Sequence, residues 1–288
     1  MRVALGPTPT LIFFLVLMSL TDIWRIWRIT PHFVSVFVIL FGIGLFGLLY
    51  KRWQGPMFAI VYAAIFGAVF NFFDFLVNPP MAPMLLAFLV LTIEFPAPQG
   101  APLKAYRQAL VFAGFVAGSW FCGYGLTWLS KWAIAAAWQT DGMDSVREIF
   151  SQVALRTFGQ EKERAIYYIP LWSTLQMLAQ SFISVGSVTV ALIAAAIGLQ
   201  LRDNWQTFDR NYFLAITTPV FIAVAWFEVI NNHSQTHSHF TYRTESAAIA
   251  IVMTAAVLTL RPQPGIKDLW SKLRDIEFKW TTKPRARV

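Results

Sequence analysis

Eight long runs of apolar residues, separated by short connections, constrain the fold of this chain more than any other feature of its sequence. A run of roughly 15 to 25 apolar residues matches a helix that crosses a bilayer. Of the 288 residues, 57% are hydrophobic and only 13% are charged, which leaves more apolar side chains than a soluble domain of this length could bury. We therefore predict an all-α, polytopic membrane helix bundle of about eight transmembrane helices. The predicted spans cover residues 10–24, 33–50, 57–77, 81–95, 108–130, 177–201, 211–230 and 244–260.

The connections between the runs contain residues that end helices. Only the connection of about residues 139–169 is long enough to fold by itself, and the apolar periodicity between Met143 and Ala165 predicts amphipathic helices on the outer surface of the membrane. The chain thus divides into a transmembrane domain, residues 1–260, and a basic tail, residues 261–288. Pro and Gly are expected to end helices in the segments Trp53-Gln54-Gly55-Pro56, Asn78-Pro79-Pro80 and Phe95-Pro96-Ala97-Pro98.

The Lys and Arg residues predict the orientation of the bundle. Eight of them follow Leu260, so the tail is expected to be cytoplasmic by the positive-inside rule. Threading the eight spans back from the tail puts 15 Lys and Arg residues inside and 8 outside, with both termini cytoplasmic. The tail is expected to bind anionic membrane lipid, and no nucleic-acid partner is predicted.

This topology places one polar segment, NHSQTHSHFTYR, on the outer face of the membrane. The last apolar run, residues 246–260, has 15 residues, which is about 22 Å of helix against a hydrocarbon core of about 30 Å. Its helix is therefore expected to begin earlier, inside HFTYR, and to draw Tyr242, Arg243 and Glu245 towards membrane depth. Ionisable groups at that depth are costly without a partner or a water-filled cavity, which makes them candidate site residues.

Other polar residues fall on the same predicted face. Asp74 lies near the outer end of the third span. Tyr124, Trp128 and Lys131 follow each other at four- and three-residue intervals, so they share one side of the fifth helix. Asp74 and Lys131 could act in catalysis, or Asp74 could simply pair with Lys131 or with Arg243 to satisfy a buried charge.

The histidines allow more than one interpretation. His233 and His237 stand four residues apart, a spacing that suits a metal if the segment is helical, and His239 could supply a third ligand. Hydrogen-bonding histidines in a polar pocket and a solvated loop are the alternatives, so no cofactor is predicted and a divalent metal stays an open alternative. The single cysteine, Cys122, excludes an internal disulfide.

Three segments carry a resemblance to a known group of proteins: FFDFLVNPP (72–80), GYGLTWLSKW (123–132) and WFEVINNHSQTHSHFTYR (226–243). From about residue 20 to 260, the chain resembles the C-terminal half of a group of bacterial multi-pass membrane proteins, which are similar to the GT-C glycosyltransferases of lipid-linked sugar transfer. The resemblance implies an enzyme of the bacterial inner membrane that takes a sugar from a polyprenyl-phosphate donor on the outer face. The matching positions are Asp74, Tyr124, Trp128, Lys131, His233, His237, Tyr242 and Arg243.

Glycosyl transfer from a phosphate donor needs cations at the leaving phosphate, a base for the nucleophile, and aromatic surfaces for the sugar and the prenyl chain. On this interpretation Arg243 and Lys131 hold the phosphate. Tyr124, Trp128 and Tyr242 bind the substrate. Asp74 or one of the three histidines, His233, His237 and His239, takes the proton.

The chain departs from the GT-C pattern in its first outer loop, residues 25–32, which contains no acidic residue. Enzymes of this kind carry a carboxylate there as the general base. Either an N-terminal part outside this chain supplies the base, or another carboxylate serves, or the chain is not such an enzyme. The other classes are a transporter or metal-handling protein, whose polar residues would continue through the membrane, and a non-catalytic subunit. Gly114 and Gly118 form a GxxxG pattern that predicts close packing against another helix, in this chain or in a membrane-protein partner.

Overall fold

The computed structural model describes residues 6–21, 30–50, 52–53, 55–73, 78–94, 103–138, 144–159, 176 and 185–260. Most of these residues are helical and none of them lies in a β-strand, which confirms the all-helical fold class for the described part of the chain. The helices are α2 (Pro7–Leu20), α4 (Thr30–Tyr50), α5 (Pro56–Phe70), α6 (Met81–Glu94), α7 (Leu103–Ala137), α8 (Ser145–Phe158), α10 (Val185–Asp203), η1 (Trp205–Thr207), α11 (Arg210–Thr217), α12 (Val220–Val229), α13 (Asn231–Thr236) and α14 (Ser238–Thr259).

Each predicted apolar run contains helix, and the expected helix breakers end or divide several of these helices. α5 begins at Pro56, directly after Gly55, whose φ of 136° is a conformation that glycine adopts readily. Pro219 separates α11 from α12 within the seventh run, because proline has no backbone N–H to donate. The predicted amphipathic helix also forms, as α8, whose first turn is capped by Asp144 through a 3.1 Å hydrogen bond from the Arg147 backbone N–H.

Among the described residues, two helical stretches, Arg107–Ala137 and Arg210–Val229, are long and apolar enough to cross a membrane. Four further apolar helices are shorter, at 10–17 residues. α7 is much longer than its predicted span: its 35 residues correspond to about 52 Å of helix. Length and composition therefore support membrane association through these two stretches.

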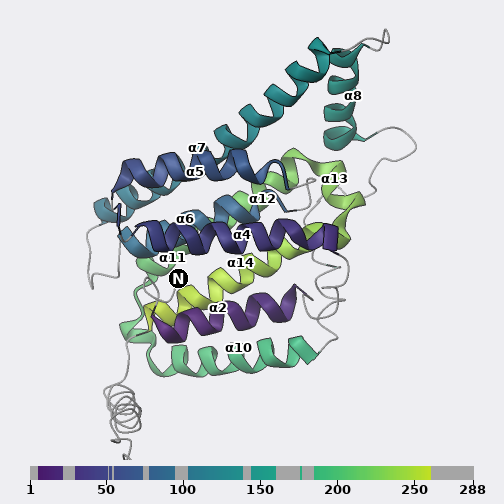
Figure 1. Ribbon diagram of the computed structural model, residues 1–288. Helices are drawn as coiled ribbons and strands as arrows, with labels where there is room; N and C mark the ends of the chain where they lie inside the picture. Colours follow the sequence, from purple (N-terminus) through teal and green to yellow (C-terminus); the bar gives the residue numbers. More distant parts are fainter. Residues whose placement is uncertain are drawn as a thin grey trace, which may run out of the picture.

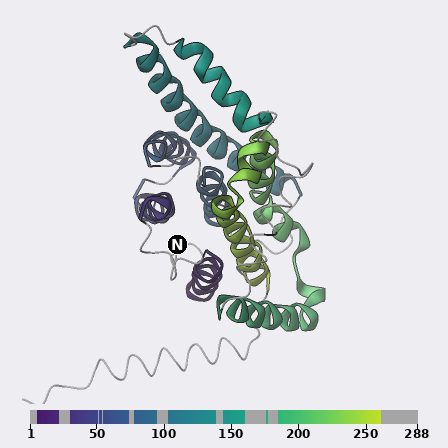
Figure 2. The ribbon, with the colours of Figure 1, turned by 90° about the vertical axis from the view of Figure 1, so that its right-hand side faces the viewer.

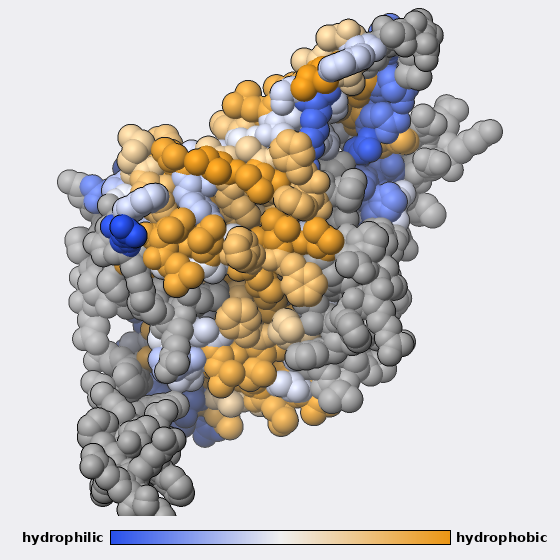
Figure 3. Space-filling model, viewed as in Figure 1, coloured by the Kyte–Doolittle hydropathy of each residue, from blue (hydrophilic) through white to orange (hydrophobic). Residues whose placement is uncertain are grey.

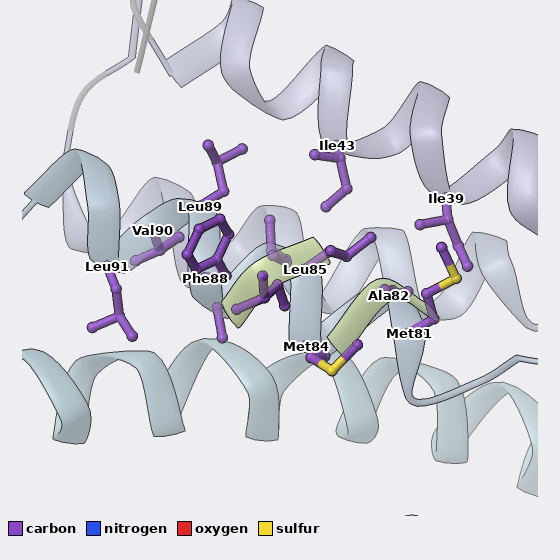
Figure 4. Close-up of a cluster of buried hydrophobic side chains, with 14 of the residues drawn as sticks. Ile39, Ile43, Met81, Ala82, Met84, Leu85, Phe88, Leu89, Val90 and Leu91 are labelled. Carbon is purple, nitrogen blue, oxygen red and sulfur yellow. The ribbon is translucent and has the colours of Figure 1, made fainter. Parts of the chain in front are cut away.

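The short helix α6 forms the centre of the bundle. Every residue from Met81 to Thr92 is buried, because α4, α5, α7, α11, α12 and α14 all pack around this helix. Figure 4 shows the side chains of α6 beside Ile39 and Ile43 of α4. An apolar helix of 14 residues that is enclosed on all sides has no face left for lipid. Its apolar composition is explained by packing inside the protein.

Glycines of α5 and α7 form a close helix contact in the core. A Cβ atom added to Gly67 would collide with the Trp120 carbonyl oxygen, and one added to Gly123 would collide with the Ala64 carbonyl oxygen. The two backbones can approach only because these side chains are absent. Cβ atoms at Gly114 and Gly118 would meet none of the described neighbours within 4 Å, so packing of this GxxxG pair against a membrane-protein partner stays a prediction.

The helices α2, α4, α5, α6 and α14 run roughly along one common direction, and Figure 2 shows several of them nearly end-on. At one end of the bundle α2 and α5 finish, α6 and α14 begin, and α13 lies across the junction; we call this the α13 end (right in Figure 1). α7 continues past the bundle at this end, and α8 returns beside it to contact α13. The opposite end holds the start of α11 and the end of α14.

The outer surface of the bundle is rich in apolar side chains. In the view of Figure 3 they cover much of the described face, whereas polar side chains gather towards α8. The exposed side chains include Phe41 of α4, Ile65 of α5 and Phe115 of α7. Apolar patches of this size on a protein exterior mark contact with lipid or with another apolar surface. Exterior and interior are thus similar in polarity, unlike those of a water-soluble domain.

Candidate functional site

The polar segment that the sequence singled out forms the junction between α13 and α14. α13 covers Asn231–Thr236, and the chain bends at His237, with φ −111° and ψ 28°, before α14 begins at Ser238. The prediction that the last helix starts upstream of its apolar run is confirmed, and the start lies even earlier than HFTYR. The Thr241 hydroxyl donates to the Ser234 carbonyl oxygen at 3.3 Å and so connects the two helices across the bend.

Two of the predicted histidines lie side by side. The rings of His233 and His237 have centroids 4.6 Å apart, as expected for a four-residue interval around one helical turn. His237 is open to solvent on one side, yet nearby protein atoms remove part of its hydration. Desolvation is the larger cause and the positive charge of Arg156 is the smaller one, and both lower the pKa of His237 below its ordinary value of 6.5. The imidazole of His237 is therefore neutral at pH 7.

The amphipathic helix α8 is attached to this junction. The Asn232 side-chain amide donates to the Leu155 carbonyl oxygen at 2.9 Å, which joins α13 to the last turns of α8. Arg156 follows Leu155, and its Nη1 donates to the carbonyl oxygen and to the Oε1 of Gln152 at 3.1 and 2.7 Å. Gln152 in turn donates to Glu148 at 2.9 Å. This series of bonds along α8 fixes the guanidinium close enough to His237 to act on its pKa.

The first turns of α14 are polar and enclosed. All six residues from Thr241 to Ser246 are buried, and Arg243 is only 2% exposed. The Arg243 guanidinium carbon lies 5.3 Å from the centroid of the Tyr242 ring. The Ser246 hydroxyl donates to the carbonyl oxygen of Leu20, the last residue of α2, at 3.2 Å. Burial of Arg243 and Glu245 in one segment is costly, and such costs are typical of binding and catalytic sites.

A second polar group lies between α5 and α7. Lys131 Nζ donates to the Asn71 side-chain oxygen at 2.6 Å and to its carbonyl oxygen at 3.0 Å, and it lies 4.3 Å from the Phe72 ring centroid. The Asn71 amide donates to the Tyr124 carbonyl oxygen at 3.1 Å. Asn71 thus connects the end of α5 to the middle of α7 and holds Lys131 at the end of α5.

The predicted face of α7 is confirmed as a continuous row of aromatic rings. Trp120 and Tyr124 stack with centroids 5.0 Å apart, Tyr124 and Trp128 are 5.9 Å apart, and Trp128 and Trp132 are 5.2 Å apart. The row leads along α7 towards the α13 end. Trp120 and Tyr124 are buried in the core, so only the partly exposed rings of Trp128 and Trp132 are open to a long apolar chain or the face of a sugar ring.

The structure therefore brings the predicted residues into two groups. Tyr124, Trp128 and Lys131 belong to the α5–α7 group. The α13–α14 group contains His233, His237, Tyr242 and Arg243. Asp74 lies outside the described residues, as does the side chain of His239, so their roles stay predictions.

The possible metal site can be checked only among the described residues. Within the described part of the chain, no group of three or more His, Cys, Asp or Glu side chains is placed to hold a metal ion. Because the His239 side chain is not among the residues searched, the three-histidine site stays a prediction. The basic tail and the Trp24-Arg25-Ile26-Trp27-Arg28 segment also lie outside the described residues.

Sequence reasoning missed three residues that connect the site. Asn71 binds Lys131, Asn232 attaches α8, and Arg156 acts on His237. For Arg156 a signal existed, because Ile149, Gln152 and Arg156 follow each other at helical intervals on the less exposed side of α8. Nothing in the sequence indicated that this side would meet α13.

Comparison of the chain with models of known protein families finds no match. No curated protein and no solved structure is similar to it either.

Proposed function

We propose that the chain is a multi-pass membrane protein of about eight transmembrane helices, with both termini in the cytoplasm and the α13 end on the outer face. The apolar exterior and the two long apolar stretches support the membrane location. The distribution of 15 Lys and Arg residues on one side against 8 on the other supports the orientation. On this proposal α6 counts as a crossing that is shielded from lipid by its neighbours.

We further propose that the α13 end binds the phosphate of a polyprenyl-phosphate-linked sugar and transfers the sugar, as a GT-C-like glycosyltransferase would. One observation carries this proposal: Arg243 is buried beside Tyr242 in a fully enclosed polar turn at the end of the bundle. A guanidinium binds a phosphate through two parallel hydrogen bonds, and an aromatic ring beside it can support a sugar or an isoprene unit.

The proposed reaction is a displacement at the anomeric carbon. The acceptor hydroxyl forms a new C–O bond to that carbon while the bond to the phosphate oxygen breaks, and the phosphate leaves with the bonding electrons. Arg243, with Lys131 as a second cation, stabilises the negative charge that develops on the leaving phosphate. His237 is neutral at pH 7 and can accept the proton that the acceptor hydroxyl loses, and Asp74 is the other candidate base.

The substitution Arg243→Lys tests the site. It keeps the positive charge but removes the two-pronged donor, so affinity for polyprenyl phosphate in lipid nanodiscs should fall by about 1.5–3 kcal/mol, the worth of a charge-assisted hydrogen bond. The melting temperature should change little. A lower melting temperature with unchanged affinity would instead assign Arg243 to a structural role.

Arg210 offers a matched control. It lies at the opposite end of the bundle, exposed, with its guanidinium carbon 4.6 Å from the Trp205 ring centroid. Arg210→Lys makes the same chemical change beside an aromatic ring, and it should leave the affinity for polyprenyl phosphate unaltered. Equal losses in both variants would show that the loss of affinity does not come from a phosphate site at the α13 end.

Thiol labelling tests the orientation. In a Cys122→Ser background, a cysteine at the exposed Thr236 should react with a membrane-impermeant reagent from outside the cell. A cysteine at the exposed Gln206, at the other end of the bundle, should react only after the membrane is opened. The reverse pattern would overturn the proposed orientation. Ser234 is unsuitable for this test because it is fully buried.

A further inference from the structure

An arginine of α8 lies where it can share a ligand with the two histidines of α13. α8 packs along α13, and the 2.9 Å bond from Asn232 to the Leu155 carbonyl oxygen fixes the two helices at this point. Arg156 and His233 are the next residues in each helix. The two elements therefore present one guanidinium and two imidazole rings at a single contact.

The bonds of Arg156 leave one edge of its guanidinium available. Nη1 donates to Gln152, whereas Nε is buried and has no hydrogen-bond partner among the described residues. A buried donor without a partner is costly, and a ligand that accepts from it is one way in which a protein offsets that cost. The edge formed by Nε and Nη2 is the one that arginine commonly uses to bind an oxyanion with two parallel bonds.

The charges around this edge favour an anion. Among the described residues, the charged or histidine side chains on the surrounding elements are Arg147, Glu148 and Arg156 of α8, His233 of α13, Arg243 and Glu245 in the first turns of α14, Glu228 of α12 and Lys131 of α7. Glu148, on the same helix as Arg156, is occupied by its hydrogen bond from Gln152. The positive charge of Arg156 acts against protonation of His237, and a bound anion would remove that opposition.

We propose that Arg156, His233 and His237 form an anion site between α8 and α13, and that its ligand carries a phosphate group. The site rests on the proposed function only for the assignment of that phosphate to a lipid-linked donor. A free phosphate would use the same donors. In either case α8 contributes a binding residue to the α13 end, in addition to covering part of its surface.

The test uses the full chain in lipid nanodiscs with two probes, inorganic phosphate and polyprenyl phosphate, and calorimetry as the measurement. Arg156→Gln should weaken phosphate binding about tenfold or more, because it removes a charge-assisted pair of bonds. Arg147→Gln is the matched control: it removes the same charge from an exposed position nine residues away, roughly half a turn around the same helix. This control should bind both probes like the wild type.

A second readout separates a binding role of the site from a structural one. Sulfate keeps its charge between about pH 5 and 8, so any pH dependence of its binding reports on the protein. Sulfate affinity should rise as the pH falls and His237 takes up a proton, and His237→Gln should flatten this dependence. If Arg156→Gln proves unstable, Arg156→Lys keeps the charge and should still lose several-fold in affinity because the two-pronged geometry is gone.

The outcomes distinguish this inference from the proposed function. Binding of polyprenyl phosphate that depends on Arg243 but not on Arg156 would overturn the inference and leave the proposed function standing. Binding of inorganic phosphate that depends on Arg156, without binding of the lipid, would support the anion site and count against the glycosyltransferase. Absence of binding to both probes in the wild type would overturn both.

Discussion

Two segments of the bundle are equally buried but opposite in chemistry. In α6 all residues from Met81 to Thr92 are enclosed, and all but the last are apolar or proline. In α14 the six residues Thr241–Ser246 are enclosed, and all but the aromatic Tyr242 are polar or charged. α6 lies at the centre of the helices, while the polar turn lies at the α13 end beside α2 and α13.

The difference distinguishes residues that stabilise the fold, as in α6, from residues whose burial the rest of the fold must compensate, as in Thr241–Ser246. An enclosed apolar helix gains favourable packing along its whole length and needs no further explanation. An enclosed turn that contains Arg243 and Glu245 carries a desolvation cost, because two ionisable groups leave water. The bundle thus buries charged groups at its α13 end and none along α6 at its centre. This cost of desolvation is the physical reason for placing the site at the α13 end.

The largest effect on stability is expected in α6. Phe88→Ala would leave a cavity in the fully enclosed core and should lower the free energy of unfolding by about 3–5 kcal/mol. Phe115→Ala, on the exposed side of α7, is the matched control and should cost far less. Thermal unfolding in detergent measures both. A similar loss in the two variants would show that enclosure of α6 does not determine stability.

A smaller effect is expected from two hydroxyls of the polar turn. Ser246→Ala removes the 3.2 Å hydrogen bond to the Leu20 carbonyl oxygen and should cost about 0.5–1.5 kcal/mol. The Thr244 hydroxyl is fully buried and has no partner among the described residues, so Thr244→Val should be neutral or stabilising. If Thr244→Val is the more damaging of the two in the same unfolding assay, a ligand or water holds that hydroxyl.

The smallest effect concerns pH. Because the folded protein lowers the pKa of His237 below 6.5, the unfolded chain takes up a proton first as the pH falls. His237 should therefore lower stability progressively from about pH 6.5 down to its folded pKa, and should have no further effect below it. His237→Gln should be less sensitive than the wild type to acid in this window. Identical melting curves against pH would contradict the shifted pKa.

The sequence predicted the helices well because apolar runs and Gly-Pro breaks are local signals. It also predicted the face of α7 that carries Tyr124, Trp128 and Lys131, and the early start of α14. The face of α7 follows from the spacing of its residues, and the early start of α14 follows from the length that a membrane helix needs.

Other features depended on packing that no local pattern encodes. An apolar run reads the same whether it faces lipid or other helices, so the complete enclosure of α6 could not be predicted. Small residues occur on several faces of α5 and α7, and only the fold selects Gly67 and Gly123 over Gly114 and Gly118 for close contact. The approach of Arg156 to His237 joins residues about 80 positions apart, which is beyond any helical periodicity.

The central claim is that the polar α13 end binds the phosphate of a lipid. The most direct measurement compares polyprenyl phosphate with the corresponding polyprenol, which lacks the phosphate, as ligands of the wild-type chain in nanodiscs. The two lipids offer the same apolar chain, so only a phosphate site distinguishes them. We expect polyprenyl phosphate to bind at least about tenfold more tightly, the value of a single charge-assisted hydrogen bond. Equal affinity for the two lipids would contradict the account.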